Sequence, residues 1–342
     1  MNRPLAKPPA RAAIGVGDMM PRITLPSASG GVFDSWDQLT SGMARAYWLG
    51  TPPDAAIAVR LSEELAASET LLHIVLTAQP AEPCDYPSWV LDQAGELGRA
   101  FAATGPLVVL VDPAGRVAAL LPGASPDAIL EQATGLYAAT APILVQAKAP
   151  VLFLERVFDP AFCKTLLEHW QRSSKLANKV ASNSGNVINA EIKRRQDVQV
   201  SDPLLFVQVR DTIMRRVVPV MEQVYHARIN VLEAPLIGCY GSESGGWFRR
   251  HKDNTSSTTA HRQFALSINL NSTDEYDGGL LRFPEFGREL YAPVAGGGLV
   301  FSTAMVHEVT PVTRGRRFGV FTFLSASGPA SLSTNGPSMT RQ

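Results

Sequence analysis

The sequence predicts two domains of different fold class, an α/β domain in the first half of the chain and an α+β domain rich in antiparallel strands in the second. The chain has 342 residues, which exceeds one ordinary domain of about 150. In the first half, apolar runs with the length of strands alternate with segments of helical period, a pattern typical of βαβ units on a mostly parallel sheet. In the second half, short β-branched and aromatic runs separated by glycine favour an antiparallel sandwich or barrel.

The elements of the first half follow from periodicity and from capping residues. Strands are expected at residues 44–48, 71–76, 107–111 and 117–121. Helices are expected at residues 54–67, 90–101 and 126–138. Asp54 and Ser125 are the expected N-caps of the first and last helix. The DPAG sequence at residues 112–115 predicts a turn in which Gly115 is left-handed. The pattern loses its period at residues 139–150, where we place the domain boundary.

The second half begins with two expected helices and continues with strands. The helices span residues 160–172 and 203–225, with Asp159 and Asp202 as caps. Residues 173–188 between them are small and polar, which predicts a mobile loop. The strand-like runs that follow are VLEAPLIGCY, FALSINLN, GGLLRFP, GGGLVFS and RRFGVFTFLS. Residues 327–342 are rich in Ser, Gly and Pro and are expected to form a flexible tail.

Composition and charge restrict the classes of partner. The 31 basic and 31 acidic residues cancel, so we expect neither nucleic acid nor a membrane surface as a partner. No apolar run reaches the roughly 18 residues of a membrane span. The first residues, MNRPLAKPPARAA, lack the apolar core of a secretion signal. Cys84, Cys163 and Cys239 are far apart and form no CxxC pair, which indicates a reducing compartment and a cytoplasmic protein.

The run GGWFRRHKDN contains the residues with the strongest chemical implication. Residues two apart on a strand share a face, so His251 and Asp253 direct an imidazole and a carboxylate to one point. His307 follows in AMVHEVTPV, and two histidines with one carboxylate are the ligand set of non-haem Fe(II) oxygenases. Arg317 lies ten residues after His307, and its guanidinium fork matches a carboxylate. The alternatives are an exposed surface pair for His251 and Asp253 and a core histidine for His307.

Around these residues the chain resembles the 2-oxoglutarate- and Fe(II)-dependent dioxygenases, specifically the prolyl 4-hydroxylase-like branch. The corresponding stretches are CYGSESGGWFRRHKDN, LSINLN, GGLLRFPEFG, AGGGLVFSTAMVHEVTPVTRG and RRFGVFTFL, in the order of that family. The resemblance covers about residues 153–324. It implies that the domain of residues 151–326 has a double-stranded β-helix, or jelly-roll, core.

The resemblance implies a role for each matching residue. His251, Asp253 and His307 would bind Fe(II), and Arg317 would bind the C5 carboxylate of the cosubstrate 2-oxoglutarate, with Tyr240 as a second donor. O2 is the other cosubstrate, and ascorbate is the expected reductant. The chain departs from the family at Leu281, where a Thr is common. The basic anchor is often Lys, and here Arg314 and Arg316 compete with Arg317, although Arg316 is expected on the opposite face of the strand.

The first half resembles the thioredoxin-like fold of peroxiredoxins over residues 14–140, from GDMMPRITLPSASGGVF to VDPAGRV. That family needs a reactive cysteine at its first helix, where this chain reads TPPDAAIAVRL. The usual peroxidase activity is therefore excluded, and Cys84 lies in a later segment. We expect a non-catalytic domain that docks a protein partner, presents substrate or mediates dimerisation.

The implied function is hydroxylation of an aliphatic C–H, in a prolyl or other side chain of a peptide or protein. The alternatives are a dioxygenase acting on a free amino acid or small metabolite, and a thioredoxin-fold binding or sensor protein with an inert oxygenase domain. The oligomeric state is open, with a homodimer as one option. Arg194, Arg195, Arg249 and Arg250 are interpreted as a solvated face, with a substrate-binding rim as the alternative. A loop carrying Arg194 and Asp197 is a hypothetical lid, and His261 is interpreted as a loop or strand-edge residue.

Overall fold

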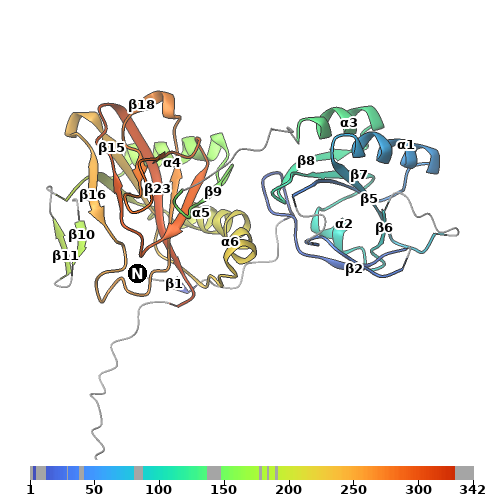
Figure 1. Ribbon diagram of the computed structural model, residues 1–342, viewed down its shortest axis with the longest axis horizontal. Coiled ribbons are helices and arrows are strands. Elements are labelled where there is room, and N and C mark those ends of the chain that lie inside the picture. Colours follow the sequence, from blue (N-terminus) through green and yellow to red (C-terminus); the bar gives the residue numbers. More distant parts are fainter. Residues whose placement is uncertain are drawn as a thin grey trace, which may run out of the picture. The chain divides into compact units, whose positions relative to one another are not determined.

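The computed structural model describes residues 3–4, 13–28, 30–37, 42–80, 88–136, 148–176, 179–182, 185–188 and 192–327. The chain divides into two compact units (Figure 1). One consists of Pro8–Ile143, and the other combines Met1–Lys7 with Leu144–Gln342. None of the helices in the described ranges has the length and apolar character needed to span a membrane. Cys84, most of the expected boundary segment and residues 328–342 of the expected tail lie outside the described residues.

The N-terminal unit is built on a five-stranded mixed sheet in the order β6-β5-β4-β7-β8. Its strands are β4 (Ala44–Leu49), β5 (Thr70–Leu76), β6 (Ser88–Leu91), β7 (Leu107–Val111) and β8 (Val117–Pro122). The pairs β4–β5 and β5–β6 are parallel, whereas β4–β7 and β7–β8 are antiparallel. The expectation of a mostly parallel sheet is therefore wrong, because β7 runs antiparallel to β4 and the short turn after β7, with Gly115 at φ 84°, returns β8 antiparallel to β7. A short ribbon of β2 (Thr24–Pro26) and β3 (Val32–Asp34) completes the strands.

Helices cover both faces of this sheet (Figure 1). Those of the unit are α1 (Ala55–Ala66), α2 (Glu96–Ala100) and α3 (Pro126–Thr134). Asp54 and Ser125 cap α1 and α3 as expected. α1 and α3 bury their apolar residues in one cluster, and α2 contributes to a second cluster around Tyr47. This order of strands and helices is that of a thioredoxin-like domain.

The helix expected at residues 90–101 is wrong in its first part. Ser88–Leu91 forms the edge strand β6, and the helix begins only at Glu96. The Asp92 carboxylate accepts the N–H groups of Glu96 and Leu97 at 2.8 Å each, which fixes the start of α2 after the strand. The apolar residues of the strand are therefore not part of the helical period.

A buried polar group lies inside the N-terminal unit. The His73 ring stacks on Tyr47 with 5.1 Å between ring centroids, and Phe33 packs edge-on against both. Within the described residues, neither ring nitrogen of His73 has a hydrogen-bond partner. Burial, helped by the charge of Arg45, lowers the pKa of His73 to about 4. The folded unit therefore holds this histidine neutral.

We expect the N-terminal unit to lose stability as the pH falls from 6.5 towards 4, because the unfolded chain then protonates His73 and the folded unit does not. Hydrogen exchange of the β4 and β5 amides, corrected for intrinsic rates, measures the loss. His73→Phe keeps the ring stack and should flatten the pH dependence, whereas His226→Gln, at an exposed site in the other unit, should not. The same pH dependence in His73→Phe and wild type would contradict this assignment.

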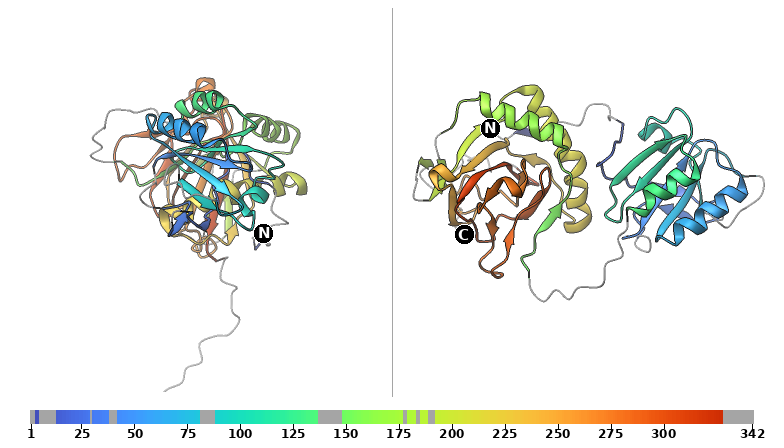
Figure 2. Two further views of the ribbon diagram at one scale, coloured as in Figure 1. Left: turned by 90° about the vertical axis from the view of Figure 1, so that its right-hand side faces the viewer. Right: turned by 90° about the horizontal axis from the view of Figure 1, so that it is seen from above.

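The core of the C-terminal unit is formed by two sheets that face each other (Figure 2). The larger sheet contains β1 (Arg3–Pro4), β9 (Leu152–Leu154), β13 (Gln196–Gln199), β14 (Val231–Leu232), β15 (Leu236–Gly241), β17 (Phe264–Asn269), β18 (Tyr276–Asp277), β21 (Gly298–Ser302) and β23 (Arg314–Ser325). The smaller sheet runs β12 (Lys193–Arg194), β16 (Trp247–His251), β22 (His307–Val309), β19 (Leu281–Arg282), β20 (Leu290–Tyr291). One apolar cluster joins both sheets, with Leu299 and Phe301 from β21 and Leu281 and Val309 from the smaller sheet. The result is the double-stranded β-helix that the family resemblance implied.

Outside the larger sheet, the described residues form the helices α4 (Pro160–Arg172), α5 (Pro203–Arg216) and α6 (Val218–Tyr225). Trp170 of α4 packs edge-on against Phe318 of β23, and Tyr225 of α6 stacks on Phe264 of β17. Asp159 and Asp202 cap their helices as expected.

Two expectations for this unit are wrong. The single helix at residues 203–225 is two helices that separate at Val217, because Pro219 in the first turn of α6 has no N–H to continue the hydrogen bonds of α5. Within the expected loop at residues 173–188, the described residues include an antiparallel hairpin of β10 (Lys179–Ser182) and β11 (Gly185–Ile188).

Candidate metal centre

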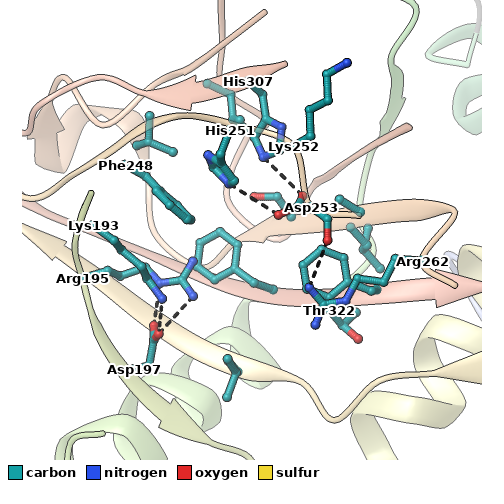
Figure 3. Close-up of a pocket in the computed structure, with 18 of the residues that line it drawn as sticks. Lys193, Arg195, Asp197, Phe248, His251, Lys252, Asp253, Arg262, His307 and Thr322 are labelled. Atoms are coloured by element: carbon teal, nitrogen blue, oxygen red, sulfur yellow. Dashed lines mark hydrogen bonds and ion pairs between the residues drawn. The ribbon is translucent and has the colours of Figure 1, made fainter. Parts of the chain in front are cut away.

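Strand pairing brings two imidazoles and one carboxylate together. β16 and β22 are antiparallel neighbours, and His251 lies directly opposite His307 with 4.2 Å between ring centroids. Asp253 follows β16, and its N–H donates to the carbonyl of Thr303 at 3.0 Å. Its carboxylate oxygens lie 3.4 Å from Nε2 of His251 and 3.3 Å from Nε2 of His307 (Figure 3). One ligand atom from each residue falls within 4.8 Å of the others.

Hydrogen bonds to the backbone orient both imidazoles. Nδ1 of His251 lies 2.7 Å from the carbonyl of Arg249, and Nδ1 of His307 lies 3.1 Å from the carbonyl of Met305. A carbonyl only accepts, so both Nδ1 atoms carry the proton and both Nε2 atoms offer a lone pair. Two lone pairs and a carboxylate then converge on one point. This donor set fits a divalent transition metal such as Fe(II).

The ionisation of the three groups is consistent with that fit. Burial acts to raise the pKa of Asp253, but the neighbouring His307 and His251 hold it well below its ordinary range. Burial lowers the pKa of His251. The pKa of His307 is raised, because the Asp253 carboxylate outweighs the effect of burial. The carboxylate is therefore ionised at neutral pH and favours a cation beside it.

Aromatic rings and a cavity surround these groups. The cavity has a volume of about 670 Å³ and is lined by the three residues. Phe248 stacks on the His251 ring at 3.6 Å, and Phe301 packs edge-on against His307 at 4.7 Å. These contacts restrict the rotation of both imidazoles, while the side that faces the cavity is available for small molecules.

Arg317 lines the same cavity and is 1% exposed. Its Nε and one terminal nitrogen donate to Oδ1 of Asn269 at 3.1 and 3.0 Å, and the other terminal nitrogen donates to the carbonyl of Gly279 at 2.6 Å. A side chain at position 279, where φ is +64°, would meet Val312 at 2.8 Å and Arg317 at 3.3 Å, so glycine is required there. The guanidinium is thereby held in one orientation.

The neighbours of Arg317 point elsewhere. Arg316 pairs with Glu243 at 3.0 Å and Arg314 with Asp277 at 2.7 Å. Each of these four side chains is at least half exposed. The expected alternation of Arg316 and Arg317 is confirmed. Tyr240 also lines the cavity, where its hydroxyl accepts from Arg195 at 3.4 Å. Leu281, at the position of the family's Thr, is buried in the cavity wall.

Sequence reasoning missed a second charged group in this cavity. Lys193, Arg195 and Asp197 are buried and line it (Figure 3), with contacts to Asp197 of 2.6 Å from Lys193 and 2.5 Å from Arg195. The segment is not a loop, since β12 pairs with β16 and β13 with β15. The interpretation of Arg195 as solvated is wrong, whereas Arg194 and Arg249 are exposed as expected. The two-residue spacing of Lys193, Arg195 and Asp197 was the signal for one buried face.

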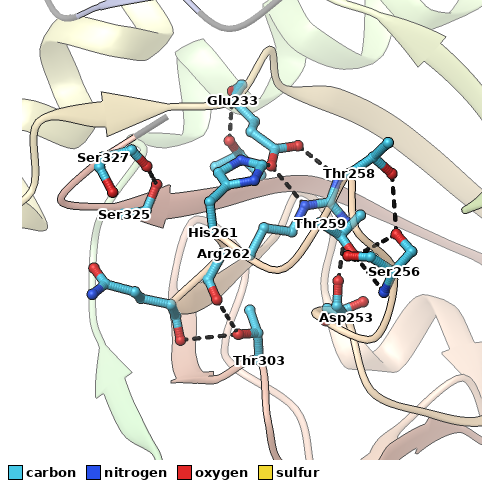
Figure 4. A network of polar contacts seen from close by, with 12 residues as sticks. Glu233, Asp253, Ser256, Thr258, Thr259, His261, Arg262, Thr303, Ser325 and Ser327 are labelled. Atoms are coloured by element: carbon cyan, nitrogen blue, oxygen red, sulfur yellow. Dashed lines mark hydrogen bonds and ion pairs between the residues drawn. The ribbon is translucent and has the colours of Figure 1, made fainter. Parts of the chain in front are cut away.

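A third charged group is centred on Glu233 (Figure 4). Arg262 donates to both of its oxygens at 2.6 and 2.7 Å, and His261 lies 3.2 Å from it. The Arg262 guanidinium also stacks over the Phe323 ring at 3.7 Å. Glu233 and Arg262 line the cavity, and contact with Glu233 accounts for the position of the His261 side chain.

The thiols of the described residues are not placed for redox chemistry. Cys163 and Cys239 are buried in the C-terminal unit. Burial raises the pKa of Cys163 to about 11 and that of Cys239 to about 12, which suppresses the reactive thiolate. The segment after β4, where peroxiredoxins need their cysteine, contains none between Thr51 and Leu61. It begins with the Thr51 carbonyl, which accepts a hydrogen bond from Trp48 Nε1 at 2.9 Å.

A two-histidine, one-carboxylate site on a double-stranded β-helix defines the class of the C-terminal unit as a non-haem iron oxygenase fold. Residues 236–325 match the family described as the 2OG-Fe(II) oxygenase superfamily. This segment contains all three candidate ligands and Arg317. The C-terminal unit is a 2OG-Fe(II) oxygenase domain, similar in sequence to PKHD-type hydroxylases.

Curated relatives of the chain include PKHD-type hydroxylases. One from Shewanella sp. (strain ANA-3) is 28% identical over 148 residues, which cover 42% of this chain and 65% of the relative. One from Synechococcus sp. (strain JA-3-3Ab) is 29% identical over 105 residues, 29% of this chain and 46% of the relative. The chain thus spans about half the length of the latter relative.

Among solved structures, the match to a Pseudomonas putida prolyl-4-hydroxylase covers 53% of this chain and 94% of that protein's chain, with 18% identity and a TM-score of 0.42. A Trichoplax adhaerens prolyl hydroxylase was solved with a peptide fragment of hypoxia inducible factor. Its match covers 54% of this chain and 87% of that protein, with 16% identity and a TM-score of 0.45. A putative thiol:disulfide interchange protein DsbE of Chlorobium tepidum covers 36% of this chain and 99% of its own, with 16% identity and a TM-score of 0.32.

We expect the full-length protein to bind one Co(II) ion at this site, seen as visible d–d absorption. His307→Ala should weaken Co(II) binding by more than about a hundredfold, because loss of a group that only hydrogen-bonds to a metal ligand already weakens metal affinity roughly 10- to 100-fold. His261→Gln removes a histidine that pairs with Glu233 and should bind Co(II) as wild type does. Equal Co(II) spectra for wild type and His307→Ala would place the ion elsewhere.

Proposed function

We propose that the protein is an Fe(II)- and 2-oxoglutarate-dependent dioxygenase that hydroxylates an aliphatic C–H bond. His251, Asp253 and His307 are the proposed iron ligands, and Arg317 is the proposed anchor of the 2-oxoglutarate C5 carboxylate. One observation carries the proposal. The three ligand atoms lie within 4.8 Å of one another on the wall of a cavity that Arg317 also lines.

The bound iron, together with 2-oxoglutarate and O2, supplies the oxidising chemistry that converts a C–H bond into a C–OH bond. The protein's own groups bind and orient. Arg317, held by Asn269 and Gly279, presents a fixed donor to the far carboxylate of the cosubstrate. Tyr240, whose ring lies 5.9 Å from the Arg317 guanidinium, is the second proposed contact. Phe248 and Phe301 exclude water from the sides of the imidazoles.

The substrate belongs to one of two classes. The names of these curated relatives, PKHD-type hydroxylases, support hydroxylation as the reaction, and a prolyl or other side chain in a peptide or protein is the proposed acceptor. A free amino acid or another small metabolite is the alternative, which the cavity of about 670 Å³ is large enough to hold. For the N-terminal unit, the absence of a cysteine after β4 supports a non-catalytic role in docking substrate or partner.

We expect succinate to form from 2-oxoglutarate in the presence of Fe(II), O2 and ascorbate, and to be lost in His251→Ala. Arg317→Met should raise the KM for 2-oxoglutarate by about 10- to 100-fold, because a hydrogen bond to a charged group contributes about 1.5–3 kcal/mol. Arg317→Lys keeps the charge without the fork and should be intermediate.

Arg316→Met removes the same side chain from the outer face of β23 and is the matched control, expected to leave the KM unchanged. Mass spectrometry of cell extract for products heavier by one oxygen separates protein from metabolite substrates. No 2-oxoglutarate turnover in wild type with any extract fraction would favour an inert sensor or binding protein instead.

A further inference from the structure

The three candidate metal ligands differ in how the chain holds them. His251 and His307 lie opposite each other on paired strands, and the ring of each is oriented by a backbone carbonyl two residues earlier. Asp253 lies in the turn that follows β16. Its position therefore depends on contacts other than the pairing of β16 with β22.

Both polar groups of the Asp253 main chain are engaged by residues from outside its own strand. Its N–H donates to the Thr303 carbonyl at 3.0 Å, and its carbonyl accepts from a terminal nitrogen of Arg262 at 3.4 Å (Figure 4). Thr303 in turn donates through its hydroxyl to the Arg262 carbonyl at 2.7 Å and through its N–H to the Gln263 carbonyl at 3.1 Å. Both contacts of Asp253 thus lead to Arg262 and Gln263, which lie directly before β17.

The Arg262 side chain is fixed by residues attached to the larger sheet. Glu233 accepts from its Nε at 2.6 Å and from one terminal nitrogen at 2.7 Å, a two-pronged contact that sets the plane of the guanidinium. The guanidinium also lies over the Phe323 ring at 3.7 Å. Glu233 is bonded to β23 in turn, because its N–H donates to the Phe323 carbonyl and its carbonyl accepts from the Thr322 hydroxyl. The second terminal nitrogen of Arg262 is the one that reaches Asp253.

The pair of Arg262 and Glu233 carries no net charge, which suits a position beside a metal. A guanidinium without a counter-charge, bonded to the main chain of a metal ligand, would repel a divalent cation, and the repulsion grows as water is excluded. The Arg262 and Glu233 side chains are only 18% and 16% exposed, and the Glu233 carboxylate offsets the positive charge. Arg262 can therefore hold the Asp253 turn with little electrostatic cost to metal binding.

We propose that Arg262 is a positioning residue for the metal ligand Asp253 and that Glu233 orients Arg262 for this role. The inference rests on the proposed function, since it takes Asp253 as an iron ligand. It adds the pair of residues that connects this carboxylate ligand to the larger sheet. The two imidazoles need no such pair, because contacts within their own segments orient them.

The test measures metal binding rather than turnover. The full-length protein is titrated with Co(II), whose d–d absorption reports affinity and ligand geometry. Proton NMR of the Co(II)-saturated protein then resolves the paramagnetically shifted Nδ1–H protons of the bound imidazoles. We expect Arg262→Met to weaken Co(II) binding by about 10- to 100-fold and to shift the d–d band, because the Asp253 turn is no longer held. Both shifted imidazole protons should remain.

Further variants separate positioning from a general loss of structure. Arg262→Lys keeps the charge without the fork and should bind Co(II) with intermediate affinity. Glu233→Gln should also weaken Co(II) binding. Combined with Arg262→Met, it should add no further loss, because Glu233 acts through Arg262 and the double variant leaves no unpaired carboxylate. Arg314→Met, which breaks an exposed pair with Asp277, is the matched control and should bind Co(II) as wild type does.

Wild-type Co(II) affinity and an unchanged d–d band in Arg262→Met and in Glu233→Gln would overturn the inference. So would loss of the shifted imidazole protons in Arg262→Met, since the whole site would then have collapsed. A change confined to the KM for the hydroxylated substrate would also overturn it, because Arg262 would then be a substrate contact. Co(II) binding that depends on Arg262, without 2-oxoglutarate turnover in wild type, would contradict only the proposed function.

Discussion

The site depends on one constraint, the enclosure of the Asp253 carboxylate between two imidazoles whose Nδ1 protons are already given to backbone carbonyls. Removing a carboxylate from water without a cation beside it costs roughly several kcal/mol of free energy, even after the protein relaxes around it. The Asp253 carboxylate raises the pKa of His307 against the effect of burial, which shows how strongly it attracts a positive charge beside it. A divalent cation satisfies the carboxylate and both lone pairs at once. Strand pairing makes the arrangement rigid, since His251 and His307 are opposite each other in register.

Charge balance extends the same reasoning to other groups of the cavity. With the proposed divalent metal and dianionic cosubstrate, the charges of Asp253 and Arg317 balance, and Glu233 neutralises Arg262 in a two-pronged pair. The lowered pKa of Lys193, about 8, arises chiefly from burial and then from Arg195. The N-terminal unit contrasts with this site, because its buried His73 is held neutral and its fold lacks a cysteine after β4.

The metal ligands and Arg317 could be predicted from the sequence because the spacing of His251 and Asp253 is local and the family resemblance added His307 and Arg317. The pairing of β16 with β22, which brings His307 opposite His251, is a property of the fold. His251 and Asp253 are close in sequence, although Asp253 lies after the end of β16 and its position depends on the turn as well. Alternation along β23 places Arg316 and Arg317 on opposite faces, as expected. The run that contains Lys193 obeys the same rule, but its polarity resembles that of a loop, and only the strands on either side reveal that it is buried. The pair of Glu233 and Arg262 joins residues 29 apart through the sheet, which no local pattern predicts.

The most direct test of the site is an anaerobic titration of the full-length protein with Fe(II) and 2-oxoglutarate, followed by visible absorption. Chelation of the keto acid by ferrous iron produces a metal-to-ligand charge-transfer band that neither component gives alone. The geometry predicts this band at one equivalent of iron in wild type and its loss in Asp253→Ala. A band of unchanged intensity in Asp253→Ala, or none in wild type, would contradict the assignment of this site.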